Sequence, residues 1–166
     1  NGIKTVTDIE FQLDIYDSND WMAEHLVSDV FRILPMGEDA VQVYEREPQS
    51  ADIVLFDNEE CTMIVTGFDP ESDWGYAVNV YLVNNTDKNL MFSVQDASVN
   101  GFMCDPFWAH TVAAGKASNT DITWFTSALE DAGITEVESL TLPIRVYDAD
   151  DWMAEDVVNE SFTIIP

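Results

Sequence analysis

The sequence predicts an all-β protein: an antiparallel β-sandwich with one short helix, preceded by an extra β-hairpin. Two observations lead to this prediction. Short runs of β-branched and aromatic residues recur along the chain, with turn signals between them. In addition, one segment occurs twice, and both copies alternate apolar and polar residues as paired strands do.

The duplicated segment covers residues 2–35 and residues 133–166, at an offset of 131 residues without a gap. The copies are identical at 14 of 34 positions, and most other apolar positions exchange Ile, Leu, Val or Phe. A repeat of this length has the usual size of one domain. We therefore expect residues 1–35 to be the closing hairpin of a preceding repeat, residues 36–52 a linker, and residues 53–166 the sandwich domain.

The first copy is expected to pair Ile9–Asp17 with Val27–Leu34. Its apolar face should lie against an apolar partner, because an isolated hairpin is marginal in water; this face comprises Ile9, Phe11, Leu13 and Ile15. Later strands are expected at residues 53–57, 61–66, 76–84, 90–94, 122–125, 139–148 and 162–165. In two of these strands, one face should be apolar, with Cys61, Met63 and Val65 in one and Val78, Val80 and Leu82 in the other.

Turn and helix signals complete the arrangement. Asn100-Gly101 predicts a tight turn. A helix is expected at Ser127–Ala132, capped by Thr126 or Ser127 and ended by Gly133. Pro143 suggests that its strand lies at a sheet edge or carries a bulge. Many short strands with a single helical turn indicate an immunoglobulin-like antiparallel β-sandwich.

The charge balance excludes two classes of partner. Six Lys and Arg against 32 Asp and Glu give a net charge of −26, which repels nucleic-acid phosphates and anionic lipids. The acidic residues are spread among bulky apolar ones, as on the solvated surface of a secreted protein rather than in a disordered tail. No apolar run reaches the length of a membrane span, so we expect no membrane insertion.

Two cysteines, Cys61 and Cys104, lie within the complete unit. An even number in an exported domain favours a disulfide, which would stabilise the fold by roughly 3–4 kcal/mol. Two buried free thiols are the alternative, since Cys61 shares a predicted core face with Met63 and Val65. Either way, we expect the two thiols not to be exposed together.

The repeated motif YDxxDWMAE places carboxylates close together, which raises the question of a calcium site. The spacing differs from that of an EF-hand, because Trp152 stands at the fifth position counted from Asp148 and no glycine follows. A solvated loop in which Asp caps the turns explains the motif as well. We predict no metal and no cofactor.

Three tryptophans directly follow an acidic residue in sequence typical of loops, as Asp20-Trp21, Asp73-Trp74 and Asp151-Trp152. Exposed loop tryptophans stack on sugars or anchor protein interfaces, and these six residues are the candidate binding residues. Each tryptophan could instead pack against an end of the sandwich. Trp124 alternates within a strand and is expected in the core.

Catalytic signatures are weak in this sequence. The two histidines, His25 and His110, lack the spacing of metal ligands, and no nucleophile elbow or phosphate-binding glycine loop is present. A glycosidase would need two carboxylates, but so acidic a chain offers pairs everywhere. We therefore expect no enzyme.

The stretch NVYLVNNTDKNLMFSVQDASVNGFMCDP, followed by AAGKASNTDITW and SALEDAGITEVESLTLPIRVYD, resembles a family of secreted immunoglobulin-like domains. Such domains are abundant in surface and lipid-anchored proteins of Gram-positive gut clostridia and are similar in fold to the immunoprotective extracellular antigens of mycobacteria. The resemblance covers residues 53–166, and residues 2–35 match the closing segment. It implies an extracellular location, secreted or at the bacterial cell surface.

These observations predict a non-enzymatic binding module of a surface protein that engages a host protein. Some repeat-bearing surface proteins of gut commensals capture host immunoglobulin in a superantigen-like manner, so immunoglobulin is the most specific candidate partner. A carbohydrate-binding module that uses the loop tryptophans is the first alternative. A structural spacer is the second.

Overall fold

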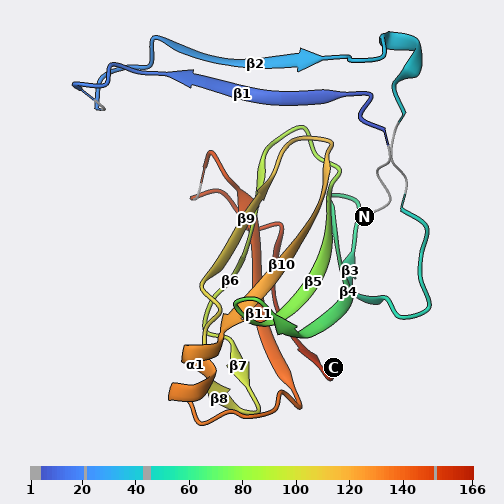
Figure 1. Ribbon diagram of the computed structural model, residues 1–166, viewed down its shortest axis with the longest axis vertical. Helices are drawn as coiled ribbons and strands as arrows, with labels where there is room; N and C mark the ends of the chain where they lie inside the picture. Colours follow the sequence, from blue (N-terminus) through green and yellow to red (C-terminus); the bar gives the residue numbers. More distant parts are fainter. Residues whose placement is uncertain (1–4, 21, 43–45, 152) are drawn as a thin grey trace. The chain divides into compact units, whose positions relative to one another are not determined.

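The computed structural model describes residues 5–20, 22–42, 46–151 and 153–166 (Figure 1). The chain divides into two compact units, Asn1–Glu47 and Pro48–Pro166, which are described separately. The predicted all-β fold with one short α-helix is confirmed. Among the described residues, no helix has the length and apolar character needed to cross a bilayer.

The first unit contains the predicted antiparallel hairpin. Strand β1 (Ile9–Ile15) pairs with β2 (Val27–Ile33), and a 3₁₀ turn, η1 (Glu38–Ala40), follows. The four apolar residues that alternate along β1 are each about two-fifths exposed, between 39% and 42%. Across the hairpin, the rings of Phe11 and Phe31 stack with their centroids 5.9 Å apart.

The second unit is a sandwich of two antiparallel sheets. The first sheet has the order β10-β5-β4-β3, with bounds β3 (Ile53–Asp57), β4 (Cys61–Ser72), β5 (Gly75–Asn84) and β10 (Ala117–Phe125). Helix α1 (Thr126–Asp131) follows β10 directly. Strand β4 continues past its predicted end at residue 66, because a register shift between Val65 and Gly67 lets pairing with β5 resume beyond the glycine.

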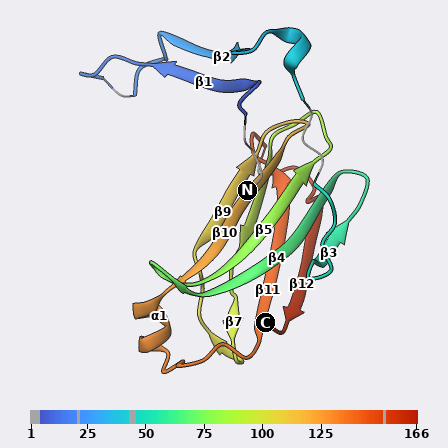
Figure 2. The ribbon, with the colours of Figure 1, turned by 45° about the vertical axis from the view of Figure 1, so that its right-hand side comes forward.

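The second sheet has the order β8-β7-β11-β6-β9. Strands β7 and β6 pair with successive parts of one edge of β11, and β12 pairs with its opposite edge. Its strands are β6 (Leu90–Val94), β7 (Ser98–Val99), β8 (Phe102–Met103), β9 (Trp108–Val112), β11 (Leu140–Asp148) and β12 (Val158–Ile164). Figure 2 shows this sheet behind β4, β5 and β10. At the β3 and β12 edges, the ring centroids of Phe56 and Phe162 lie 5.8 Å apart.

The core lies between the two sheets and is built from the inward-facing side chains of both. The predicted apolar faces of β4 and β5 are buried, and so is Trp124 on β10. The second sheet contributes Leu140, Leu142, Ile144 and Val146, each at most 1% exposed. Alternation along the strands therefore identified the core correctly.

Two local predictions were wrong. Strand β11 is interior rather than an edge, and Pro143 is accommodated because β7 pairs with Leu140–Thr141 and β6 only from Ile144 onward, which leaves a gap at the proline. Helix α1 has no side-chain cap. Instead, the backbone N–H of Thr126 donates to the carbonyl of Trp74 at 3.0 Å, so the turn of the neighbouring hairpin satisfies one N–H at the helix N-terminus.

Candidate functional site

The end of the sandwich that carries α1 is assembled around Gly75. This residue starts β5 opposite Phe125, with a φ of +144°. A Cβ atom there would lie 2.2 Å from the carbonyl oxygen of Trp124 and 2.6 Å from the amide nitrogen of Thr126. Only glycine allows this approach, which holds the β4–β5 turn, with Asp73 and Trp74 at its tip, against the start of α1.

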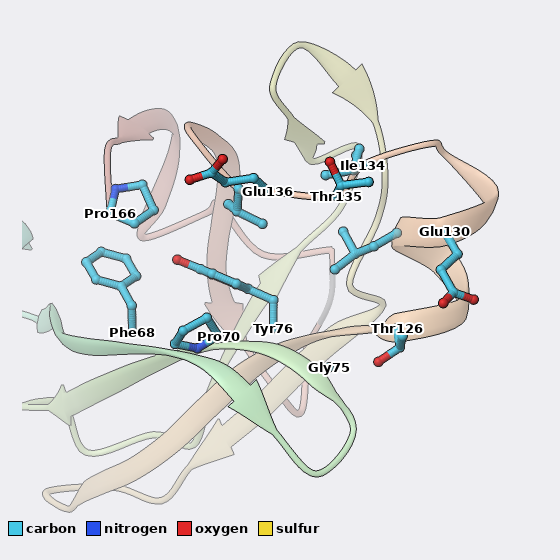
Figure 3. A pocket seen from close by; sticks show the side chains of 12 residues that line it. Phe68, Pro70, Gly75, Tyr76, Thr126, Glu130, Ile134, Thr135, Glu136 and Pro166 are labelled. Atoms are coloured by element: carbon cyan, nitrogen blue, oxygen red, sulfur yellow. The ribbon is translucent and has the colours of Figure 1, made fainter.

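A cleft of about 610 Å³, named here the α1 cleft, opens at this end of the sandwich (Figure 3). This volume lies within the range of small-molecule sites. Most of its walls are apolar, and only a few polar groups interrupt them. The lining residues are Phe68, Pro70, Gly75, Tyr76, Thr126, Leu129, Glu130, Ile134, Thr135, Glu136, Val137 and Pro166.

Tyr76 is the unusual member of the α1 cleft. The residue is only 8% exposed, and its buried hydroxyl oxygen has no hydrogen-bond partner among the described residues. Burial raises the pKa of Tyr76, so the phenol is neutral at pH 7. In Figure 3 the hydroxyl points along the cleft toward Phe68 and Pro166, with Glu136 on the same side. An unpaired buried hydroxyl costs about 1–3 kcal/mol, which calls for an explanation.

Hydrogen bonds hold the loop wall of the cleft in place. The backbone N–H of Ile134 donates to the carbonyl of Leu129 at 2.8 Å and turns the chain out of α1. The Asn100 side chain then donates from Nδ2 to the carbonyl of Glu136 at 2.7 Å. Its Oδ1 accepts the backbone N–H groups of Glu138 and Ser139 at 2.8 and 3.0 Å. The cleft is therefore preformed.

Four aromatic side chains are exposed on the elements at this end, and we name them the aromatic rim: Trp74, Phe102, Phe107 and Phe125. Trp74 is 71% exposed at the β4–β5 turn, adjacent to Phe125 across Gly75. Phe102 and Phe107 flank Cys104, whose carbonyl accepts the Trp124 indole N–H at 2.8 Å. This bond brings their segment to the end of β10.

Phe107 is held in an unfavourable backbone conformation and is 96% exposed. Its φ is +53°, a region that costs a bulky residue roughly 1–2 kcal/mol. Asp105 supports this geometry, because its Oδ1 accepts the Phe107 N–H at 3.1 Å and its Oδ2 accepts the N–H of Asp96 at 3.2 Å. The fold thus presents an aromatic ring to solvent at a cost in stability.

A second hollow, of about 350 Å³, lies on the other side of the β4–β5 turn. Trp74 forms part of its wall, and the other lining residues are polar except Ala77: Asp69, Glu71, Ser72, Asp73, Asn79 and Asp121. Four carboxylates give it a strongly negative potential. Within the described residues, no group of three or more His, Cys, Asp or Glu side chains is arranged to hold a metal ion.

The candidate binding residues from the sequence do not form one site. Asp73 and Trp74 lie at the α1 end. Asp151 lies in the β11–β12 loop at the opposite end, where its Oδ1 accepts the N–H of Met153 at 3.2 Å. Asp20 has the same role in the β1–β2 loop, accepting the N–H of Met22 at 3.2 Å. Trp21 and Trp152 lie outside the described residues.

The two cysteines are free thiols, both buried, so the possible disulfide between Cys61 and Cys104 is not formed. Strand register explains why. Cys61 pairs with Asn84 at one end of β5, whereas Cys104 contacts Trp124, whose strand partner is Tyr76 at the other end. Eight residues of strand separate those positions, roughly 26 Å. Burial raises the pKa of Cys61 to about 11 and also raises that of Cys104.

A histidine and a serine join the neighbouring edges of the two sheets. His110 Nε2 on β9 lies 2.9 Å from Ser118 Oγ on β10, and the imidazole stacks on Trp108 with the ring centroids 6.4 Å apart. Burial lowers the pKa of His110, which keeps the ring neutral at pH 7. The bond therefore links two neutral groups and ties the sheets together.

Sequence reasoning missed Tyr76, Phe102, Phe107 and Phe125 as candidate site residues. For Phe107 a signal existed, because Asp105-Pro106 is a turn signal that places the next residue in a loop. The unpaired hydroxyl of Tyr76 has no signal in the sequence, since it arises from packing between β4, β5 and the loop after α1.

Comparisons with protein-family models, with curated proteins and with solved structures found no match to this chain.

Proposed function

We propose that this chain is a non-enzymatic, extracellular binding module of a bacterial surface protein, which engages a host protein through the aromatic rim. The observation that carries the proposal is Phe107, an aromatic ring 96% exposed on a backbone with positive φ. Within the described fold this ring gains little from burial, and a partner surface would recover the cost. Immunoglobulin is the most specific candidate partner.

The rim has the chemistry of an interface anchor. Interfaces draw most of their energy from a few aromatic side chains surrounded by polar residues. Trp74 and Phe107 both project from backbones held by hydrogen bonds, so little conformational entropy is lost when they bind. Carboxylates beside Trp74 form the polar surroundings.

The net charge of −26 favours a partner face that is neutral or basic. Attraction between opposite charges accelerates association, and salt screens it. An immunoglobulin partner should be bound through framework surface, independently of antigen specificity. The duplicated segment also indicates tandem units, which increase avidity without new contacts in each unit.

Surface plasmon resonance against unrelated Fabs, matrix proteins and glycans, at two ionic strengths, tests the proposal. We expect a protein partner whose association slows as salt rises. Trp74→Ala and Phe107→Ala should each weaken binding by about 1–2 kcal/mol or more. Met153→Ala is the matched control, because Met153 is 78% exposed on the β11–β12 loop at the other end. If Met153→Ala weakens binding as much as the rim variants do, the rim is not the interface.

Phe107→Gly separates binding from folding. Glycine adopts positive φ freely, so this variant should keep its stability or gain up to about 1 kcal/mol, while it loses affinity. Loss of stability together with affinity would mean that Phe107 supports the fold rather than a partner.

A carbohydrate-binding function is the second candidate, and the hollow beside Trp74 favours it. An exposed indole next to carboxylate and amide oxygens can stack on a sugar ring and accept its hydroxyl hydrogens. Glycan binding that depends on Trp74 but not on Phe107, without any protein partner, would favour this function. Lack of binding to every probe would leave the role of a structural spacer.

A further inference from the structure

We propose that the α1 cleft is a separate binding site for a small free amine, an apolar ring or short chain that carries one protonated amino group. This proposal goes beyond the partner-binding role of the aromatic rim and does not depend on it. Two independent features of the cleft lead to it: the unpaired Tyr76 hydroxyl and the distribution of carboxylates along the opening.

The Tyr76 hydroxyl provides the specific polar contact. It is buried, lacks a partner within the described part of the chain, and points into the cleft rather than into the core (Figure 3). A neutral phenol can accept a hydrogen bond from an ammonium N–H, which satisfies the oxygen. The rings of Phe68 and Tyr76 lie at the same end of the cleft, where aromatic faces attract a cation.

Charge selects among ligands of the same shape. Glu136 lies on the same side as the Tyr76 hydroxyl, and Glu130 lies at the α1 side of the opening. The lining residues that the structure describes include no Lys or Arg. An ammonium group is therefore stabilised and a carboxylate is repelled, since both glutamates and the net charge of −26 act in the same direction.

Size distinguishes a free molecule from a lysine side chain. Leu129, Ile134 and Val137 add an apolar wall to the cleft, and Ile134 lies away from the end that the Tyr76 hydroxyl points to (Figure 3). A cavity of about 610 Å³ offers room for an aromatic ring as well as an amino group. A lysine side chain has only an unbranched stem and would leave this wall uncovered.

The test compares three probes of similar shape by ¹H–¹⁵N NMR titration of the full chain: phenethylamine, 2-phenylethanol and 3-phenylpropanoate. We expect phenethylamine to bind most tightly, the alcohol roughly tenfold more weakly, and the acid not measurably. Shifts should concentrate at Leu129, Ile134 and Tyr76. Equal affinity for amine and acid, shifts elsewhere, or no binding by any probe at 10 mM or so would overturn the proposal.

Three variants locate the contacts. Tyr76→Phe should weaken phenethylamine binding by roughly tenfold without lowering the melting temperature, because the hydroxyl bonds to none of the residues that the structure describes. Tyr81→Phe is the matched control on the same strand, equally buried, and should not change the affinity. Glu136→Gln should reduce the preference for the amine over the alcohol. A lower melting temperature with unchanged affinity for Tyr76→Phe would show that the hydroxyl is structural.

N-acetyl-lysine amide distinguishes the two possible sources of an ammonium group. We expect it to bind more weakly than phenethylamine, because it cannot cover the apolar wall. Tighter binding of the lysine probe would assign the cleft to a protein partner and would contradict the proposal. None of these titrations involves the partner of the aromatic rim, so the two proposals can fail separately.

Discussion

The two copies of the duplicated hairpin have the same strands and the same register, but they differ in what covers them. Ile9 pairs with Ile33 in β1–β2, and the equivalent Leu140 pairs with Ile164 in β11–β12. The inward-facing residues of β11 are at most 1% exposed, whereas their counterparts in β1 are about 40% exposed. Local sequence therefore determines the pairing, and the opposite sheet determines the burial.

One polar side-chain contact of the two hairpins repeats as well, although the residue types differ. Asp14 Oδ1 lies 3.3 Å from His25 Nδ1 in the first copy. At the equivalent positions of the second copy, Arg145 Nε lies 2.7 Å from Asp156 Oδ1. The carboxylate lies on the strand in the first copy and in the loop in the second, so the contact is kept with its partners exchanged. This local equivalence indicates that the duplicated hairpin is a structural element, while the aromatic rim comes from elements present once in this chain.

The largest expected difference between the copies concerns core truncation. Ile144→Ala removes a side chain that is 1% exposed and should cost about 2–5 kcal/mol of the free energy of unfolding. The matched Leu13→Ala changes a side chain that is 40% exposed and should cost less than about 1 kcal/mol. Urea unfolding followed by circular dichroism measures both. Equal losses would show that the two hairpins are buried alike.

Labelling of the Cys61 thiol probes the same difference, because Cys61 lies in the core that β11 covers. At pH 8 a thiol whose pKa is about 11 is ionised in about one molecule per thousand, roughly a hundredfold less than at its ordinary value of 9.0. Iodoacetamide should therefore label Cys61 very slowly in the folded protein. Ile144→Ala should accelerate labelling, and Leu13→Ala should not. Labelling of the native chain as fast as in urea would mean that Cys61 is not buried.

The smallest expected effect concerns the loop aspartates of the two copies. Lys88 lies 3.0 Å from Asp148 and lowers its pKa, whereas the equivalent Asp17 has its pKa lowered by the N–H groups of Asn19. A carboxylate whose pKa is lowered by folding stabilises the folded state above pH 3.8, its ordinary pKa. That stabilisation is lost as the pH falls through the lowered pKa. Lys88→Gln should therefore raise the pKa of Asp148 and leave that of Asp17 unchanged, as measured by NMR titration. A shift at Asp17 would indicate that the loops are coupled.

Much of the fold could be predicted because alternation marks the long core strands β5 and β11. Val78, Val80 and Leu82 face inward as expected, and Asn100-Gly101 forms the β7–β8 turn, with both residues at positive φ. The end of β4 could not be predicted. Gly67 and Pro70 are turn signals in the sequence, yet pairing with β5 continues past them because tertiary context overrides local preference.

The candidate site was less accessible from sequence than the fold. Asp73-Trp74 was identified because an exposed turn needs only local signals. The α1 cleft forms only because folding brings Phe68, Tyr76, Leu129 and Val137 together. Their spacing along the chain does not indicate that they are neighbours in the fold. The expectation that Cys61 and Cys104 are not exposed together is confirmed, since both are buried. The sequence left open whether they are bonded, because the number of cysteines says nothing about which ends of the strands they occupy.

Hydrogen exchange of both hairpins in one sample tests most directly whether the opposite sheet provides the stability that the hairpin sequence lacks. The amides of β11 and β12 should exchange only with global unfolding of the sandwich, orders of magnitude more slowly than unprotected amides. Those of β1 and β2 should exchange far faster, despite the same register. Equal protection of the two hairpins, with no partner present, would contradict this account.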